Sequence, residues 1–220
     1  MVKTTSRSAA DLEGELSWPL EEVETKESLW SVSCDPAGKR HYFFLPENKE
    51  LSEIQRKRGI AHAWLAEKVH PLFSAVVALC PDGLPEKVFT KTLWPVLSVS
   101  RVWFVDALVV KSTPEPGRND ARARLGFLDK TFPSRKVEGS LSDYLEAALI
   151  LAEGRAFCGT RRPCSGKMAE MVEAFVRVDP FDPSIGALEK LDNELLAVWS
   201  PYRVAVARND ELDMDIWKVC

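Results

Sequence analysis

The segment 101–111, RVWFVDALVVK, constrains the fold more than any other, because apolar side chains follow one another in it almost without interruption. Such a run is stable only where water is excluded, so it belongs in the core. Its β-branched and aromatic residues are typical of a strand that is covered on both faces. We therefore predict a buried strand at 102–109, preceded by further strands at 88–92 and 95–100.

The apolar segments are too short for a membrane protein. The most apolar ones, 72–80 and 102–110, are each about half of a membrane span. The N-terminus has no apolar core followed by a cleavage site, and the five cysteines are too sparse for a disulfide-stapled secreted domain. We expect a cytoplasmic protein with reduced thiols and no membrane insertion.

The order of the sequence patterns predicts an α+β (mixed) fold. Two β-rich runs, 29–34 and 40–45, flank a connection with Pro and Gly that is typical of a hairpin. A second hairpin pattern, 202–207 and 212–219, closes the chain. Residues 112–120 have the composition of a loop. Helical periodicity predicts helices at 48–69, 72–80, 140–157, 167–177 and 185–199, with Ser140 or Ser142 and Ser184 as candidate N-caps.

The N-terminal segment is strongly acidic. Between residues 11 and 28, seven acidic side chains accompany a single lysine, Lys26. This charge opposes self-burial, so we expect residues 1–28 to form a flexible acidic arm that docks only through Trp18 and Leu20. Residues 29–220 then form a single globular α+β domain.

A basic stretch follows the apolar run. From Lys111 to Lys136, seven basic residues accompany three acidic ones, with Phe127 and Phe132 among them. Arginines interleaved with aromatic residues are typical of surfaces that bind single-stranded nucleic acid. The same surface could instead receive the acidic arm, within one chain or between two. The candidate binding residues are Arg118, Arg122, Arg124, Lys130, Arg135, Lys136, Arg161, Arg162 and Lys167.

The loop at 159–167, GTRRPCSGK, matches a nucleotide-binding loop only in outline. Six residues rather than four separate its glycines, and Met168 rather than Ser or Thr follows the lysine. These differences exclude nucleoside triphosphate hydrolysis by this loop. What remains is a basic loop before a helix N-terminus, which is a favourable place for an anion.

Metal-site patterns are incomplete in this chain. Cys158 and Cys164 are spaced too widely for a zinc knuckle, and the three histidines are isolated in sequence. Glu67 and His70 have the spacing of one metal-binding pair, without the second pair that helical bundles need. We expect an exposed Glu67 and a His70 that caps the helix C-terminus.

Catalytic patterns are equally weak. Asp35, Glu47 and Lys49 follow the order of a metal-dependent nuclease site, but Pro46 interrupts the strand that this site needs. A Ser-His-Asp or Cys-His arrangement would have to be assembled by the fold, since no Gly-x-Ser-x-Gly motif is present. Asp106 lies inside the apolar run, and a buried carboxylate requires a partner such as an arginine.

We therefore expect a non-enzymatic binding or assembly protein that acts through protein–protein contacts, with a protein partner or a second copy of the chain in a homo-oligomer. No metal and no cofactor are expected. One alternative is a single-stranded nucleic-acid-binding protein that uses the basic surface. A less favoured alternative is a metal-dependent nuclease or hydrolase around Asp35, Glu47 and Lys49, or around Asp106.

Overall fold

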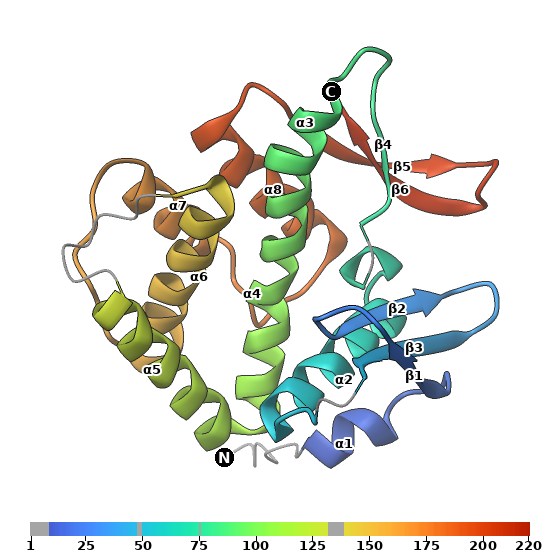
Figure 1. Cartoon of the computed structure of the whole chain (residues 1–220), viewed down its shortest axis with the longest axis horizontal. Helices are drawn as coiled ribbons and strands as arrows, with labels where there is room; N and C mark the ends of the chain where they lie inside the picture. The colour runs from blue at the N-terminus through green and yellow to red at the C-terminus, as the bar shows by residue number, and fades with distance from the viewer. Residues whose placement is uncertain (1–8, 48–49, 75, 132–138) are drawn as a thin grey trace, which may run out of the picture.

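Helix α4 (Trp94–Ser112) runs through the centre of the protein, with helices on one side and two small sheets on the other (Figure 1). The computed structural model describes residues 9–47, 50–74, 76–131 and 139–220. Trp103, Phe104 and Val105 are completely buried in α4. The burial is as expected, but the predicted strand is wrong. A helix satisfies its own backbone hydrogen bonds, and one that is buried on all sides has the same unbroken apolar run as a buried strand.

The central helix extends on its N-terminal side. The short helix α3 (Glu86–Val88) and the π-helical turn η2 (Phe89–Leu93) lead directly into α4, so the predicted strands at 88–92 and 95–100 are also wrong. By length and composition, Glu86–Ser112 could cross a membrane. However, 72% of its most apolar window is buried inside the protein, as in the core helix of a folded domain.

Four helices follow α4 along the chain and pack as successive neighbours. They are α5 (Pro114–Thr131), α6 (Leu141–Cys158), α7 (Gly166–Val176) and α8 (Ile185–Trp199). The predicted helices at 140–157, 167–177 and 185–199 are confirmed. Ser140 Oγ accepts a hydrogen bond from the Asp143 amide, and Ser184 Oγ accepts one from the Ala187 amide, so both act as N-caps.

The predicted loop at 112–120 is wrong, because most of this segment is the first half of α5. Its prolines suggested a loop, yet Pro114 and Pro116 lie in the first turn of the helix. The amides of a first turn have no partner within the helix, so proline is tolerated there.

The first sheet has the strand order β1-β3-β2 and packs on helix α2 (Glu53–Lys68). The predicted hairpin is confirmed as β2 (Ser31–Asp35) and β3 (Arg40–Pro46), which pair in antiparallel register. Gly59 allows the close contact with α2, since a Cβ there would lie 2.4 Å from the Phe43 ring. The predicted helix at 48–69 is confirmed over the bounds of α2.

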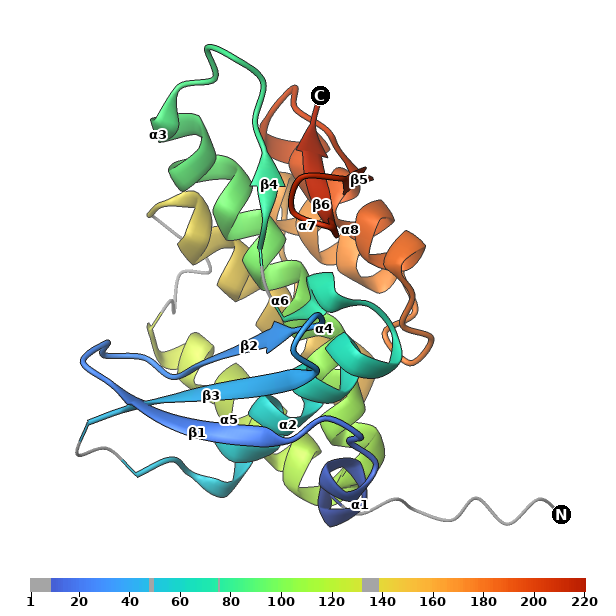
Figure 2. The same ribbon diagram turned by 90° about the vertical axis from the view of Figure 1, so that its right-hand side faces the viewer.

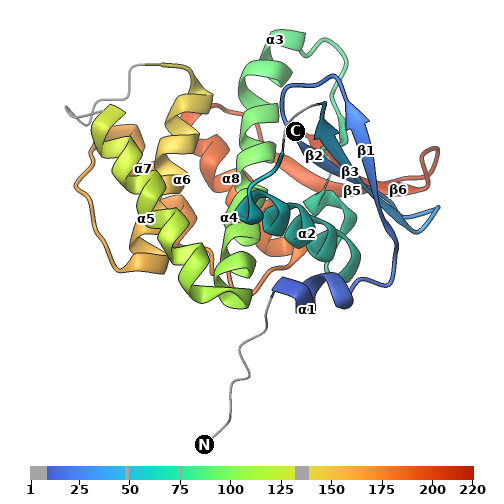
Figure 3. The same ribbon diagram turned by 60° about the horizontal axis from the view of Figure 1, so that its bottom comes forward.

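The acidic N-terminal segment is more closely packed than predicted. Strand β1 (Leu20–Thr25) pairs in parallel with β3, and helix α1 (Ala9–Gly14) lies against α2 and α4 (Figure 3). Leu12 is only 1% exposed. The expectation of docking through Trp18 and Leu20 alone is therefore wrong, while the division into an arm and a domain at residue 28 stays a prediction.

The second sheet has the strand order β4-β6-β5 and lies above the first one in the view of Figure 2. The predicted closing hairpin is confirmed as β5 (Val204–Asn209) and β6 (Met214–Val219). The predicted helix at 72–80 is wrong: a 3-10 turn, η1 (Pro71–Phe73), leads to β4 (Ala78–Leu79), which pairs in parallel with β6. Pairing with β6 supplies backbone hydrogen bonds that local helix formation would otherwise provide.

Candidate anion-binding site

The end of α6 directs a basic loop toward the space between α6 and α7. Gly159 caps α6 with φ of 67°, a left-handed conformation that suits glycine, and the Thr160 amide donates to the Gly154 carbonyl at 2.8 Å. The chain therefore turns back toward the helix that it has just left. This turn brings Arg161 and Arg162 close to Arg155, which lies in the last turn of α6.

The three arginines share one cavity of about 410 Å³. The remaining wall combines apolar side chains from both helices with Glu173 and the loop. The lining residues are Leu151, Arg155, Arg161, Arg162, Pro163, Cys164, Ala169, Val172 and Glu173. The cavity thus offers guanidinium groups beside an apolar wall.

The charge inside this cavity is incompletely neutralised. Arg155 forms an ion pair with Glu173, and Arg162 Nη2 donates to Asp129 Oδ2 at 2.8 Å. Within the described ranges, Arg161 forms no ion pair with a carboxylate. A guanidinium group presents donors in a planar fork that matches a carboxylate or a phosphate, so Arg161 is the group best suited to bind an external anion.

No family model, curated protein or solved structure matches this chain.

The other residues of the predicted basic surface are dispersed. On α5, Arg118 pairs with Glu115 at 3.7 Å and Arg122 donates to Asn119 at 2.8 Å. Lys130 is exposed near the end of the same helix. Lys167 Nζ lies 4.1 Å from the centre of the Trp199 ring, in a cation–π contact with α8. Arg135 and Lys136 lie outside the described residues.

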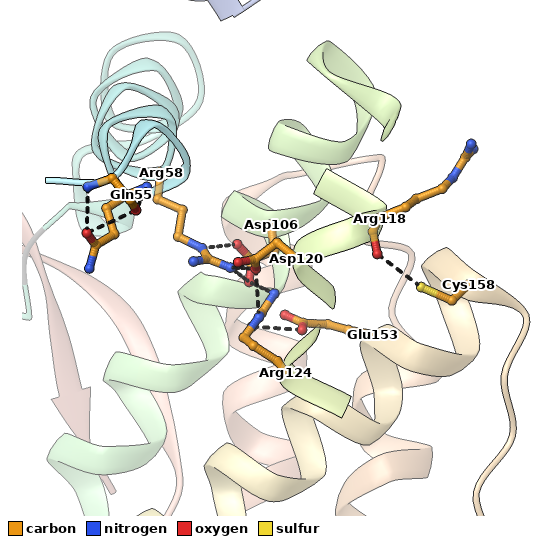
Figure 4. A network of polar contacts seen from close by, with 9 residues as sticks. Gln55, Arg58, Asp106, Arg118, Asp120, Arg124, Glu153 and Cys158 are labelled. Atoms are coloured by element: carbon orange, nitrogen blue, oxygen red, sulfur yellow. Dashed lines mark hydrogen bonds and ion pairs between the residues drawn. The ribbon is translucent and has the colours of Figure 1, made fainter. Parts of the chain in front are cut away.

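The Arg124 side chain is only 25% exposed and already binds carboxylates, so its place on the predicted binding surface stays a prediction. It belongs to a network between α2, α4, α5 and α6 (Figure 4). Arg124 donates to Asp106 and to Asp120, both at 2.9 Å, and Arg58 donates to the same two carboxylates at 2.6 Å. Asp106 thus has the arginine partner that its burial was predicted to require, and in fact has two.

The network also contains Glu153, whose carboxyl group is completely buried. Arg124 Nη1 lies 2.8 Å from Glu153 Oε2. Burial favours the neutral form of Asp106, but the charges of Arg124 and Arg58 hold its pKa well below the usual range. Burial and the neighbouring charge of Asp106 raise the pKa of Glu153 well above its usual range. The neutral, protonated form of Glu153 is therefore favoured.

A second cavity, of about 380 Å³, borders this network. Arg58 and Arg124 contribute to its wall, together with apolar residues of α4 and α6 such as Val99, Val102 and Leu149. Both guanidinium groups already bind carboxylates, so an anion that entered here would compete with partners held at 2.6–2.9 Å. We regard the network as a structural element that joins four helices.

The expected surroundings of Glu67 and His70 are wrong. The Glu67 side chain is 4% exposed and accepts hydrogen bonds from the Ser17 and Trp18 amides. His70 precedes η1, where its Nδ1 accepts from the Leu72 amide and its Nε2 lies 3.0 Å from Asp215. The described residues contain no group of three His, Cys, Asp or Glu that could hold a metal ion.

The nuclease candidate is incomplete in the described part of the chain. Asp35 accepts a hydrogen bond from the Gly38 amide in the hairpin turn, and Lys49 lies outside the described residues.

The apolar and acidic wall of the arginine cavity was not predicted from the sequence. Leu151 with Arg155, and Ala169 with Glu173, are spaced four residues apart, which places each pair on one helix face. This spacing was the available signal.

Proposed function

We propose that the protein is a non-enzymatic binding protein that captures an anionic segment of a partner protein, or of a second copy of the chain, in the cavity lined by Arg155, Arg161 and Arg162. The observation that carries this proposal is Arg161, whose guanidinium group lines the cavity without a carboxylate partner among the described residues. An anion bound there would add a charge-assisted hydrogen bond without displacing an existing ion pair.

The composition of the cavity supports a protein partner. Leu151, Ala169 and Val172 offer apolar contacts beside the arginines. Arginine next to a desolvated apolar surface is typical of protein interfaces, where a few such residues carry most of the binding energy. The acidic segment of the same chain has other partners, since Glu21 pairs with Arg40 and Glu22 pairs with Arg56.

A fluorescent glutamate-rich peptide tests this proposal. We expect Arg161→Ala to weaken its binding about tenfold, because a hydrogen bond to a charged group contributes about 1.5 kcal/mol. Arg203→Ala is the matched control, since Arg203 is exposed and forms no described ion pair near the cavity. Equal binding by the wild type and Arg161→Ala, measured by fluorescence anisotropy, would contradict the proposal.

Single-stranded nucleic acid is the second candidate ligand, and Phe127 is the observation that favours it. The Phe127 side chain is 68% exposed on α5, two residues before Asp129, the partner of Arg162. Exposed aromatic rings beside cations provide stacking surfaces for bases. If nucleic acid is the ligand, Phe127→Ala weakens binding of a labelled oligothymidylate but not of the acidic peptide. Each lost phosphate contact also lowers the salt slope by about 0.7.

A further inference from the structure

Cys34, His41 and Glu67 form a continuous polar chain at the first sheet. Cys34 Sγ lies 2.8 Å from His41 Nδ1, and His41 Nε2 lies 3.1 Å from Glu67 Oε2. Cys34 and His41 are directly opposite each other in the antiparallel pair β2–β3, so their side chains share the face of the sheet that packs on α2. Glu67 comes from the last turn of α2.

The protonation state of this chain follows from its hydrogen bonds. Burial opposes ionisation of Glu67, but hydrogen bonds from Lys68, the Ser17 amide, His41 and the Trp18 amide outweigh it and lower the pKa of Glu67 to about 2. The ionised carboxylate accepts a hydrogen bond, so His41 Nε2 carries the proton. His41 Nδ1 therefore has a free lone pair and accepts the S–H of Cys34. The indole of Trp18 stacks on the imidazole, with ring centres 5.2 Å apart, and limits its rotation.

This geometry is that of a proton relay rather than a metal site. The thiol and the carboxylate contact opposite nitrogens of one imidazole ring, so a single metal ion could not bind all three groups. A nucleophile that contacts a base, with the base oriented by a third group, is the arrangement that activates thiols and hydroxyls in covalent catalysis.

We propose that Cys34 is the nucleophile of a thiol–disulfide exchange site, with His41 as its general base and Glu67 as the positioning residue of the base. As Cys34 Sγ attacks one sulfur of a low-molecular-weight disulfide, the thiol proton moves to His41 Nδ1 and an S–S bond forms on Cys34. The disulfide bond of the substrate breaks, and its leaving thiolate takes the proton from His41. The products are a mixed disulfide on Cys34 and one free thiol.

A disulfide suits these residues better than an acyl substrate. Attack on a carbonyl builds negative charge on oxygen, which requires additional donors at that oxygen. Disulfide exchange keeps the developing charge on sulfur, in line with Cys34 and beside the protonated imidazole. Cys34 is half-buried on β2, so part of the residue remains exposed to solvent.

The base is essential to this reaction. Burial raises the pKa of the Cys34 thiol to about 12, so a free thiolate does not accumulate at neutral pH. Transfer of the proton to His41 during attack replaces prior ionisation. Burial also raises the pKa of Cys80 and Cys164, and in the described part of the chain neither thiol contacts a histidine. These two cysteines are therefore internal controls that lack a histidine partner.

The reaction rate of each cysteine tests the proposal. The full-length protein is treated with limiting 2,2′-dithiodipyridine, the reaction is quenched with acid, and the modified cysteines are identified by peptide mass mapping. We expect Cys34 to react at least about tenfold faster than Cys80 and Cys164. His41→Gln should slow Cys34 about 100-fold, the usual contribution of a general base, and leave the control cysteines unchanged. Glu67→Gln should slow Cys34 to a smaller extent, because the base is retained but less well oriented.

A rate for Cys34 that does not exceed the rate for Cys80 in the wild type would overturn the proposal, as would an unchanged rate in folded His41→Gln. If that variant unfolds, all of its cysteines react faster. The order of the cysteine reaction rates in the wild type then decides the test by itself. The result is independent of the arginine cavity, because the helices α6 and α7 that line the cavity lie on the opposite side of α4 from the first sheet (Figure 1).

Discussion

Asp106 illustrates what a single residue type reveals about its surroundings. A carboxylate inside an apolar run predicts an ion-pair partner, because burial of an unpaired charge is costly. The identity of the partner is a tertiary property, since Arg58 and Arg124 are 48 and 18 residues away in sequence. The contact between Cys34 and His41 is easier to predict from the sequence than the partners of Asp106. A hairpin between the two predicted strands places these residues near each other across the turn.

Removal of the Asp106 carboxylate is expected to destabilise the protein strongly. Asp106→Ala removes one of the two carboxylates that Arg58 and Arg124 share, and loss of a buried partner of this kind costs about 3–5 kcal/mol of unfolding free energy. Asp129→Ala is the matched control, because its ion pair with Arg162 is solvent-exposed and contributes about 1 kcal/mol or less. Urea unfolding measures both values. Similar losses in the two variants would show that the network contributes no more than a surface ion pair.

The helices that the sequence predicts correctly are those whose sequence patterns depend on residues close together in the chain. Helices α6 and α8 have periodic apolar residues and serine N-caps, and the sequence predicts both. In α4 the apolar residues cover every side of the helix, so the periodicity that distinguishes a helix from a strand is lost. In α5 the prolines of the first turn led to the prediction of a loop, although proline is tolerated at this position of a helix.

The serine caps provide a test at the element scale. Ser140→Ala removes a side-chain acceptor from the first turn of α6 and is expected to cost about 1 kcal/mol. Ser165 occupies the same position before α7, but its side chain makes no capping hydrogen bond, so Ser165→Ala should cost clearly less. Thermal and urea unfolding give both values. Equal losses would indicate that the Ser140 cap does not stabilise α6.

For the whole molecule, the acidic N-terminal segment packs more closely on the rest of the chain than its charge suggests. Its charge is compensated in two ways. Basic residues of β3 and α2 pair with Glu21 and Glu22, and strand pairing with β3 satisfies its backbone. Net charge along the sequence describes a segment in isolation, whereas the fold places opposite charges beside it.

Two leucines test this integration. Leu12→Ala should lower the unfolding free energy by about 2–5 kcal/mol, because it removes a buried side chain and leaves a cavity. Leu29 is 73% exposed, and Leu29→Ala should change the stability by no more than about 0.5 kcal/mol. If both substitutions have the same small effect in urea unfolding, the segment around Leu12 is not part of the cooperative fold.

The sequence by itself determined the α+β class, both hairpins and the capped helices, because their signals depend on neighbours within a few residues along the chain. Hydrogen bonds to the fourth preceding residue, serine caps and turn residues are local interactions of this kind. Tertiary structure alone decided that α4 is a helix, that Arg124 binds Asp106, and that Arg161 meets Arg155 at one cavity. These outcomes depend on packing between segments that are distant in the sequence. Burial on all sides removes the apolar periodicity that would identify α4 as a helix. The ion-pair partner of a charged side chain is the opposite charge that the fold places nearest to it, whatever their separation in the sequence.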